Sequence, residues 1–379
     1  MIASSPARET PLARLLAERI RARGPIPFDE YMRECLYHPQ YGYYSRAETR
    51  RFADFYTSVD VHPVFGRLIA RQLAEMWEQL GRPVPFSIVG AGAGTGRLAQ
   101  HILDFVCRQL PELYAALRYV AVELSPARRG QHDANLGVHL QAGRVLSAAE
   151  LPANIPVGCI LSNELLDALP VHRVVCQHGA LREIFVGCDD RGFCDVVQPL
   201  SSSVLAEYFA AQGITLAEGQ QGEAGLAACD WIQDAGRRLG RGFVLSIDYG
   251  HEARELYSPL HMRGTLLAYQ EHRAGEDFYR ASGQQDLTAH VNFTALDLWG
   301  RPAGLMRTGL VSQTRFLLSL ARQNDFGDLY DGSPTEAQKA KARLMFKTLI
   351  FPEGMGERFQ VLIQHKGVAA PQLTGLQPF

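Results

Sequence analysis

An apolar segment that runs directly into alternating glycines constrains the fold of this 379-residue chain more than any other feature. Residues 86–91 read Phe-Ser-Ile-Val-Gly-Ala, and residues 92–96 follow as Gly-Ala-Gly-Thr-Gly. The next segment, 97–103, has apolar residues at helical spacing. This order predicts a buried strand, a tight turn and the beginning of a helix. Because glycine has no Cβ, such a turn brings backbone N–H groups close to a ligand.

The spacing of these glycines narrows the class of ligand. A dinucleotide-binding turn needs G-x-G-x-x-G, and counted from Gly92 its last position is the bulky Arg97. A phosphate-binding P-loop needs Gly-Lys-Ser/Thr at the helix start, and this turn has none. What remains is G-x-G-x-G, the turn of S-adenosylmethionine (SAM) methyltransferases. Its candidate cofactor-binding residues are Gly92, Gly94, Thr95 and Gly96.

The second half of such a site is expected at the tip of the next strand. Residues 118–124 form a short apolar run with a single acid, Glu123, near its end, and a helix N-cap and proline follow. Ligands of an open α/β sheet bind outside the carboxyl ends of the strands, so Glu123 is placed to accept hydrogen bonds from both ribose hydroxyls. Leu124 is a further candidate contact for the cofactor. The alternative is an ordinary surface glutamate at a strand end.

Strands and helices alternate from residue 86 onward. Strands are expected at 86–91, 118–124, 158–162 and 242–249, and helices at 97–109, 126–136 and 222–239. This alternation predicts an α/β fold with a Rossmann-like, doubly wound, mostly parallel sheet. The expected divisions are a helical N-terminal extension (1–80), a SAM-binding core (81–250) with an inserted β-meander near 171–200, a substrate cap (251–345), and C-terminal strands returning to the core (346–379).

Composition excludes several classes of function. The formal net charge is −2 with acids and bases interspersed, so no polyanion-binding surface is indicated and nucleic acid is not an expected partner. The seven cysteines include no C-x-x-C pair, which argues against a zinc site or a disulfide framework. No apolar stretch has the length of a membrane span, and the first residues lack a signal-peptide core. We therefore expect a cytoplasmic protein without metal or membrane partner; a homodimer stays open.

Candidate catalytic residues follow two further strands. Asn163 and Glu164 come directly after the apolar run 158–161, and Asp248 ends the strand at 242–249. Methyl transfer from a sulfonium is an in-line displacement, so an enzyme mainly positions the acceptor and manages its proton. An amide and carboxylates suit an amine or guanidinium acceptor. The alternative is that Asn163 caps a helix and Glu164 is a first-turn acid. His251 and His290 are weaker candidates that the sequence does not place.

Many ordered motifs make the chain similar to the MidA family of class I SAM-dependent methyltransferases over nearly its whole length. The matching motifs are Pro25-Ile26-Pro27-Phe28, His38-Pro39, Gly42-Tyr43-Tyr44, Asp54-Phe55-Tyr56-Thr57-Ser58, Phe65-Gly66, residues 92–98, residues 162–172, residues 248–251, residues 286–293 and Met355-Gly356-Glu357-Arg358-Phe359.

The resemblance implies SAM as methyl donor and a methyltransferase activity. The family's mitochondrial member is an assembly factor for respiratory complex I that methylates an arginine of a partner protein. By position, the resemblance also implies that Thr57, Ser58, the glycine turn, Glu123 and the Asn163–Glu164 pair line the cofactor site.

One position departs from the family pattern. The family has an acid two residues before the first glycine of the turn, where this chain has Gly90. That acid holds the methionine end of the cofactor, so its loss predicts weaker or differently arranged SAM binding. Two other readings stay open: a small-molecule O- or N-methyltransferase that uses 251–345 as its pocket, and a non-catalytic assembly chaperone. An NAD-dependent oxidoreductase is disfavoured by Arg97.

Overall fold

The computed structural model describes residues 10–45, 58–270, 273–331, 335–351, 356 and 358–378. Contacts within the chain define two compact units, each assembled from three separate segments. Unit 1 comprises Met1–Phe55, Leu166–Trp231 and Gly250–Leu298. Unit 2 comprises Tyr56–Leu165, Ile232–Tyr249 and Trp299–Phe379.

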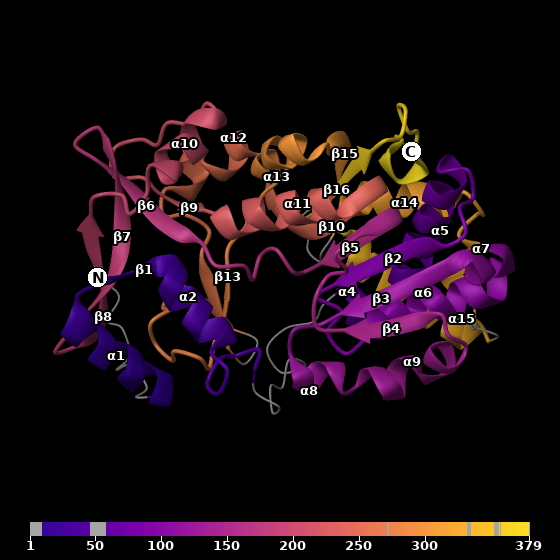
Figure 1. Cartoon of the computed structure of the whole chain (residues 1–379), viewed down its shortest axis with the longest axis horizontal. Coiled ribbons are helices and arrows are strands. Elements are labelled where there is room, and N and C mark those ends of the chain that lie inside the picture. The colour runs from indigo at the N-terminus through magenta and orange to yellow at the C-terminus, as the bar shows by residue number, and fades with distance from the viewer. Residues whose placement is uncertain are drawn as a thin grey trace. The chain divides into compact units, whose positions relative to one another are not determined.

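Unit 2 is built on one twisted sheet with the strand order β15-β16-β10-β5-β2-β3-β4 (Figure 1). Strands from β10 to β4 are parallel to their neighbours, and β16 is antiparallel to both β10 and β15. The strands are β2 (Phe86–Ala91), β3 (Leu117–Val122), β4 (Val145–Ala148), β5 (Ile155–Asn163), β10 (Leu239–His251), β15 (Met306–Ser312) and β16 (Phe359–Lys366). This sheet confirms the predicted α/β class with a mostly parallel, Rossmann-like core.

Helices of unit 2 lie on this sheet, and all of them except α8 contribute to the larger hydrophobic core. They are α4 (Ser58–Val61), α5 (Val64–Gln79), α6 (Arg97–Gln109), α7 (Pro111–Ala116), α8 (Pro126–Arg129), α9 (His132–Gln141), α14 (Gln313–Arg322) and α15 (Glu336–Ile350). Phe65 of α5, Ile88 of β2 and Ile102 of α6 are fully buried in one cluster. Each side chain of this size contributes roughly 1.5–3 kcal/mol when it leaves water. Gly66 allows α5 and α6 to approach closely, since a Cβ there would lie 2.5 Å from that of His101.

The strand, turn and helix around the glycines form where the sequence predicts them, with β2 at 86–91 and α6 at 97–109. The single helix expected at 126–136 is wrong. The chain forms α8 and then, after a turn at Gly130, a separate helix α9. The edge strand β4 was not expected, because its few residues carry no clear alternation.

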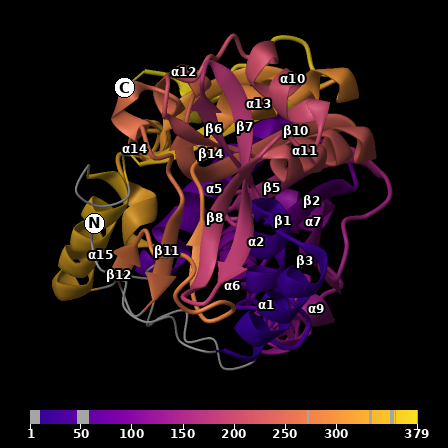
Figure 2. The same ribbon diagram turned by 90° about the vertical axis from the view of Figure 1, so that its left-hand side faces the viewer.

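Unit 1 contains the antiparallel meander expected near 171–200. Its sheet has the order β1-β7-β6-β9, with β8 on the outer side of β7, and Figure 2 shows the long strands β6, β7 and β8 beside one another. The strands are β1 (Ile26–Pro27), β6 (His172–Gln177), β7 (Ala180–Asp189), β8 (Gly192–Gln198) and β9 (Gln221–Ala224). A second small sheet pairs β11 (Leu267–Gln270) with β12 (Arg273–Gly275) and β13 (Asp286–Thr288).

The N-terminal helices of unit 1 pack on this meander. The N-terminal helices α1 (Pro11–Arg23) and α2 (Phe28–Tyr37) contact β7, and α2 also contacts β6 and β13. In the described part of the unit, the other α-helices that lie wholly within it are α10 (Ser203–Ala211) and α12 (Ala253–Leu256). Helices α11 (Leu226–Arg238) and α13 (Phe293–Gly300) each have residues in both units.

The two units therefore divide the chain differently from the boundaries drawn on the sequence. The expected extension 1–80 is split, because α1 and α2 join the meander while α5 joins the parallel sheet. The expected cap 251–345 is also split, at residue 298. Of the described residues in 346–379, only 359–366 form a strand. Boundaries drawn from sequence follow the chain, whereas these units are held by contacts between distant segments.

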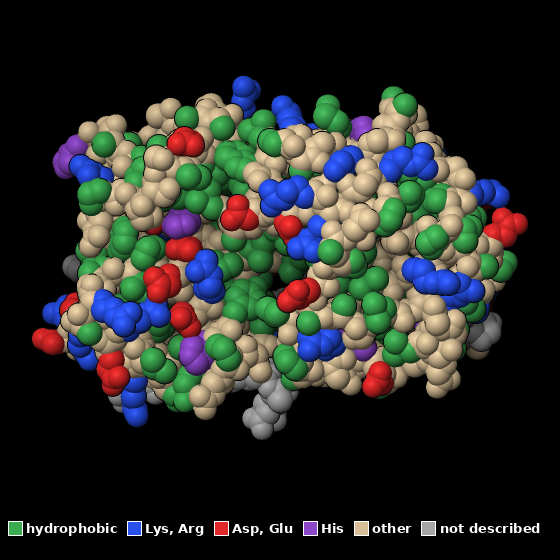
Figure 3. Space-filling model, viewed as in Figure 1, with side chains coloured by type: hydrophobic (Ala, Val, Ile, Leu, Met, Phe, Trp, Pro, Cys, Tyr) green, Lys and Arg blue, Asp and Glu red, His purple; other side chains and the backbone are tan. Residues whose placement is uncertain are grey.

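The described surface carries mixed charge and no membrane-spanning helix. Figure 3 shows Lys and Arg side chains interspersed with Asp and Glu on the face in view. Among the described residues, no helix combines the length and apolarity that a bilayer crossing needs.

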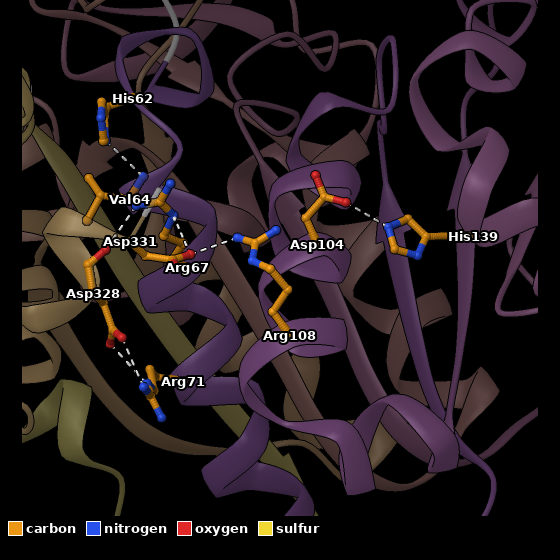
Figure 4. Close-up of polar contacts among 9 residues, drawn as sticks. All are labelled: His62, Val64, Arg67, Arg71, Asp104, Arg108, His139, Asp328 and Asp331. Carbon is orange, nitrogen blue, oxygen red and sulfur yellow. Dashed lines mark hydrogen bonds and ion pairs between the residues drawn. The ribbon is translucent and has the colours of Figure 1, made fainter. Parts of the chain in front are cut away.

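A cluster of arginines and aspartates fixes α5 in unit 2 (Figure 4). Both oxygens of Asp328 accept hydrogen bonds from Arg71, each at 2.9 Å, and the Asp328 carbonyl accepts one from Arg67 at 3.0 Å. Asp331 pairs with Arg108 of α6 at 2.7 Å. Asp328 is 5% exposed and the Arg71 side chain 27%, so this ion pair is partly shielded from water. It holds α5, the helix that directly follows α4.

We expect Asp328→Asn to lower the free energy of unfolding by about 2 kcal/mol, since the Arg71 guanidinium, whose side chain is 27% exposed, then faces an uncharged amide in place of a carboxylate. Urea unfolding measures this change. Glu112→Gln is the control, because Glu112 and its partner Arg82 are 77% and 55% exposed, and we expect it to cost less than about 1 kcal/mol. Equal losses in the two variants would contradict the role given to Asp328.

Candidate functional site

The glycine turn between β2 and α6 has one open position. Gly92, Gly94 and Gly96 all have positive φ angles, of 66°, 56° and 84°, which side chains rarely adopt. A Cβ at Gly92 would press on Leu165, and one at Gly96 would press on Leu136. A Cβ at Gly94 would meet nothing within 4 Å. Gly94 is therefore the point at which a ligand can reach the backbone.

Glu123 lies at the tip of β3 and is tied to this turn. Its Oε2 accepts a hydrogen bond from the backbone N–H of Gly94 at 2.8 Å, and its Oε1 accepts one from that of Ser125 at 2.8 Å. The residue is 7% exposed. An ionised carboxylate has about four acceptor positions, so two remain for the hydroxyls of a ribose. The carboxylate and the open face at Gly94 thus fit the nucleoside half of SAM.

Two side chains of α9 that sequence reasoning missed hold the turn from the other side. His132 Nε2 is 2.9 Å from the carbonyl oxygen of Gly94, which only accepts, so this nitrogen carries the proton. Asn135 Nδ2 donates to the carbonyl oxygen of Thr95 at 2.7 Å. The i, i+3 spacing of His132 and Asn135 is a signal that they share a helix face, but it does not say what that face contacts.

Asn163 and Glu164 end β5 in a constrained turn. Glu164 has a φ of 51°, a left-handed conformation that costs a non-glycine residue about 1–3 kcal/mol. Its Oε1 accepts hydrogen bonds from the backbone N–H of Ser58 at 3.0 Å and from Asn163 Nδ2 at 3.2 Å. The Oδ1 atom of Asn163 is buried and has no hydrogen-bond partner among the described residues. Thr57 lies outside the described residues, so its expected place in the site stays a prediction.

Asp248 is fully buried and supports the same turn. Its Oδ2 accepts a hydrogen bond from the backbone N–H of Leu165 at 3.1 Å, and its Oδ1 accepts one from that of Tyr249 at 3.0 Å. These contacts give Asp248 a positioning role next to Glu164. Its expected catalytic role stays a prediction.

Gly90 has a specific neighbour in this structure. A Cβ at this position would lie 2.4 Å from the hydroxyl oxygen of Tyr119 on β3. A larger residue at 90 therefore does not fit while Tyr119 stays in place. Leu124, by contrast, is 68% exposed at the end of β3, where it presents an apolar side chain beside Glu123.

The weaker sequence candidates lie in unit 1. His251, His261 and His290 form a loose group with ring centroids 5.3–6.3 Å apart. His290 also lines a cavity of about 300 Å³ together with Arg173 and Asp195, which form an ion pair at 2.7 Å. Within the described part of the chain, no group of His, Cys, Asp or Glu is arranged to hold a metal ion.

The strand order of unit 2, the open glycine turn and the acid at the tip of β3 together define a class I SAM-dependent methyltransferase. Comparison with known families agrees. A family model described as "Putative S-adenosyl-L-methionine-dependent methyltransferase" matches residues 68–311, and the chain belongs to this family. The predicted resemblance to the MidA family and the predicted cofactor are confirmed.

Individual relatives match over almost the full chain. A solved structure from Burkholderia thailandensis bound to S-adenosyl-homocysteine is 33% identical, covers 96% of this chain and 94% of its own, and has a TM-score of 0.85. A curated Drosophila melanogaster protein named "Protein arginine methyltransferase NDUFAF7 homolog, mitochondrial" is 28% identical over 96% of this chain and 86% of its own length. The Homo sapiens protein of that type is 27% identical over 94% and 84%.

The expected cytoplasmic location is wrong by this comparison, because the curated relatives are named as mitochondrial proteins.

We expect Gly94→Val to weaken binding of S-adenosyl-homocysteine at least about 100-fold, because the new side chain occupies the open face in a strained conformation. Isothermal titration measures the affinity. Gly143→Val is the matched control, since Gly143 also has a positive φ (66°) and open space around it but lies between α9 and β4. Unchanged affinity in a folded Gly94→Val protein would count against the site.

We expect Glu123→Ala to weaken S-adenosyl-homocysteine and adenosine by about 100-fold each while leaving methionine binding unchanged, since each lost charged hydrogen bond costs about 1.5–3 kcal/mol. Competition titrations with the three ligands test this. Glu112→Ala removes an acid that is 77% exposed and serves as the control. Equal losses for adenosine and methionine would contradict a ribose contact.

Proposed function

We propose that this chain transfers a methyl group from SAM to an arginine nitrogen of a protein. The observation that carries the proposal is the Glu164 carboxylate, held in a strained backbone conformation beside the Asn163 amide at the carboxyl end of β5. The names of the curated relatives, which are protein arginine methyltransferases, support the same acceptor.

A carboxylate and an amide oxygen suit a guanidinium group. The guanidinium is a planar cation with five N–H donors and no acceptor, so it binds best to fixed acceptor oxygens. Charge-assisted bonds of this kind are about twice as strong as neutral ones. Glu164 keeps its orientation through Ser58, and Asp248 holds the backbone of Leu165 directly after it.

Bound SAM supplies a methyl group on a positively charged sulfur. The acceptor nitrogen attacks the methyl carbon as the carbon–sulfur bond breaks, the electron pair stays on sulfur, and the nitrogen then loses a proton. We propose that Glu164 and Asn163 bind the N–H groups of the acceptor and orient its lone pair in line with the methyl group. Glu164 is also the carboxylate that we expect to receive the released proton.

The acceptor is tested by incubating the protein with isotope-labelled SAM and two fractions of one cell lysate, the proteins and the small-molecule filtrate. We expect label in the protein fraction, and on methylarginine after complete hydrolysis. Label in the filtrate would favour the small-molecule methyltransferase instead. Absence of label in both fractions, with intact binding of S-adenosyl-homocysteine, would favour the assembly chaperone.

Glu164→Gln tests the role of the carboxylate in this reaction. We expect the rate of labelling to fall by about 100-fold or more, as for the loss of a general base, while the affinity for S-adenosyl-homocysteine changes little. Glu112→Gln, at the exposed acid, is the control. A Glu164→Gln protein that labels at the normal rate would contradict the proposed role.

A further inference from the structure

The hydroxyl of a largely buried tyrosine lies on the face of the unit 2 sheet that also carries Glu123 and Asn163. Tyr119 is 2% exposed, and its hydroxyl has no hydrogen-bond partner among the described residues. The hydroxyl oxygen is not among the fully buried side-chain atoms that lack a partner, so the small exposed part of Tyr119 includes this atom. A hydroxyl that reaches solvent while its ring is buried can bind a ligand directly.

The register of the sheet shows where this hydroxyl points. Tyr119 stands beside Ile88 of β2, yet its hydroxyl reaches Gly90, two residues further toward the carboxyl ends of the strands. The ring therefore leans toward the edge at which the glycine turn begins. The hydroxyl fits over Gly90 because this residue has no side chain, and the neighbouring Ala121 on β3 has only a methyl group.

The same face leads directly to the candidate site. Side chains alternate along a strand, so Tyr119 and Ala121 share a face with Glu123 at the end of β3. Across β2, Leu161 lies beside Gly90, and Asn163 follows two residues later on the same face of β5. On this face of the sheet, the side chains of β3 lead to Glu123 and those of β5 lead to Asn163, whose Oδ1 is buried and unpartnered among the described residues. The Tyr119 hydroxyl lies over β2, between these two strands.

We propose that the Tyr119 hydroxyl binds the amino-acid portion of the cofactor. Glu123 and Gly94 provide the contacts suited to the nucleoside, which leaves the β2–β5 side of the edge for the other end of the molecule. Burial raises the pKa of Tyr119 well above its usual value, so the hydroxyl stays protonated and can donate or accept. Because a hydroxyl can both donate and accept, it can bind the α-carboxylate or the α-amino group of an amino acid.

This role rests on cofactor binding and is independent of the identity of the acceptor. The test compares two ligands by isothermal titration, S-adenosyl-homocysteine and 5′-methylthioadenosine, which keeps the nucleoside and the sulfur but lacks the amino-acid carbons. We expect Tyr119→Phe to weaken the first about tenfold and to leave the second unchanged. Unchanged binding of both ligands, or equal weakening of both, would overturn the proposal.

Two further variants separate the contact from a structural effect. Gly90→Ala keeps the hydroxyl but forces it to move, since the new Cβ would lie 2.4 Å from it, and we expect the same selective weakening of S-adenosyl-homocysteine. Tyr114→Phe is the matched control, because Tyr114 lies on α7 at the amino end of β3 and bonds to His139 at 2.7 Å. Wild-type affinity in Gly90→Ala, or the same selective loss in Tyr114→Phe, would also overturn the proposal.

Discussion

The hydrogen bond between the Glu123 carboxylate and the backbone N–H of Gly94 is the interaction on which the site depends. It joins the tip of β3 to the turn that follows β2, so two neighbouring strands present one surface. The bond also consumes only part of the carboxylate's capacity to accept hydrogen bonds. The same side chain can therefore fix the shape of the turn and bind the hydroxyls of a sugar.

The surroundings of this bond keep the turn in place. His132 and Asn135 hold two of its carbonyl oxygens from α9, while β2 and α6 fix its two ends. At the end of β5, buried Asp248 supports the turn that carries Glu164. These contacts are already made in the protein alone, so little reorganisation is needed when the cofactor binds. Preorganised groups of this kind lose less free energy to ordering on binding.

Local sequence patterns predicted the strand, turn and helix around the glycines correctly, but they did not predict how distant segments of the chain combine into two units. The strand at 86–91 and the helix at 97–109 follow from apolar periodicity and from glycines that only one kind of turn accommodates. The break at Gly130 was missed because residues 126–136 read as one helix. The two units were missed because contacts between distant segments define them. His132 and Tyr119 carry no sequence signal for the site; their roles arise from the packing of α9 and the register of β3.

The most direct test of the account is a crystal structure of the protein with S-adenosyl-homocysteine. We predict that the ribose hydroxyls lie within hydrogen-bond distance of the Glu123 carboxylate and that the ligand crosses the open face of Gly94. A ligand bound elsewhere, or a Glu123 carboxylate turned away from the sugar, would contradict the account.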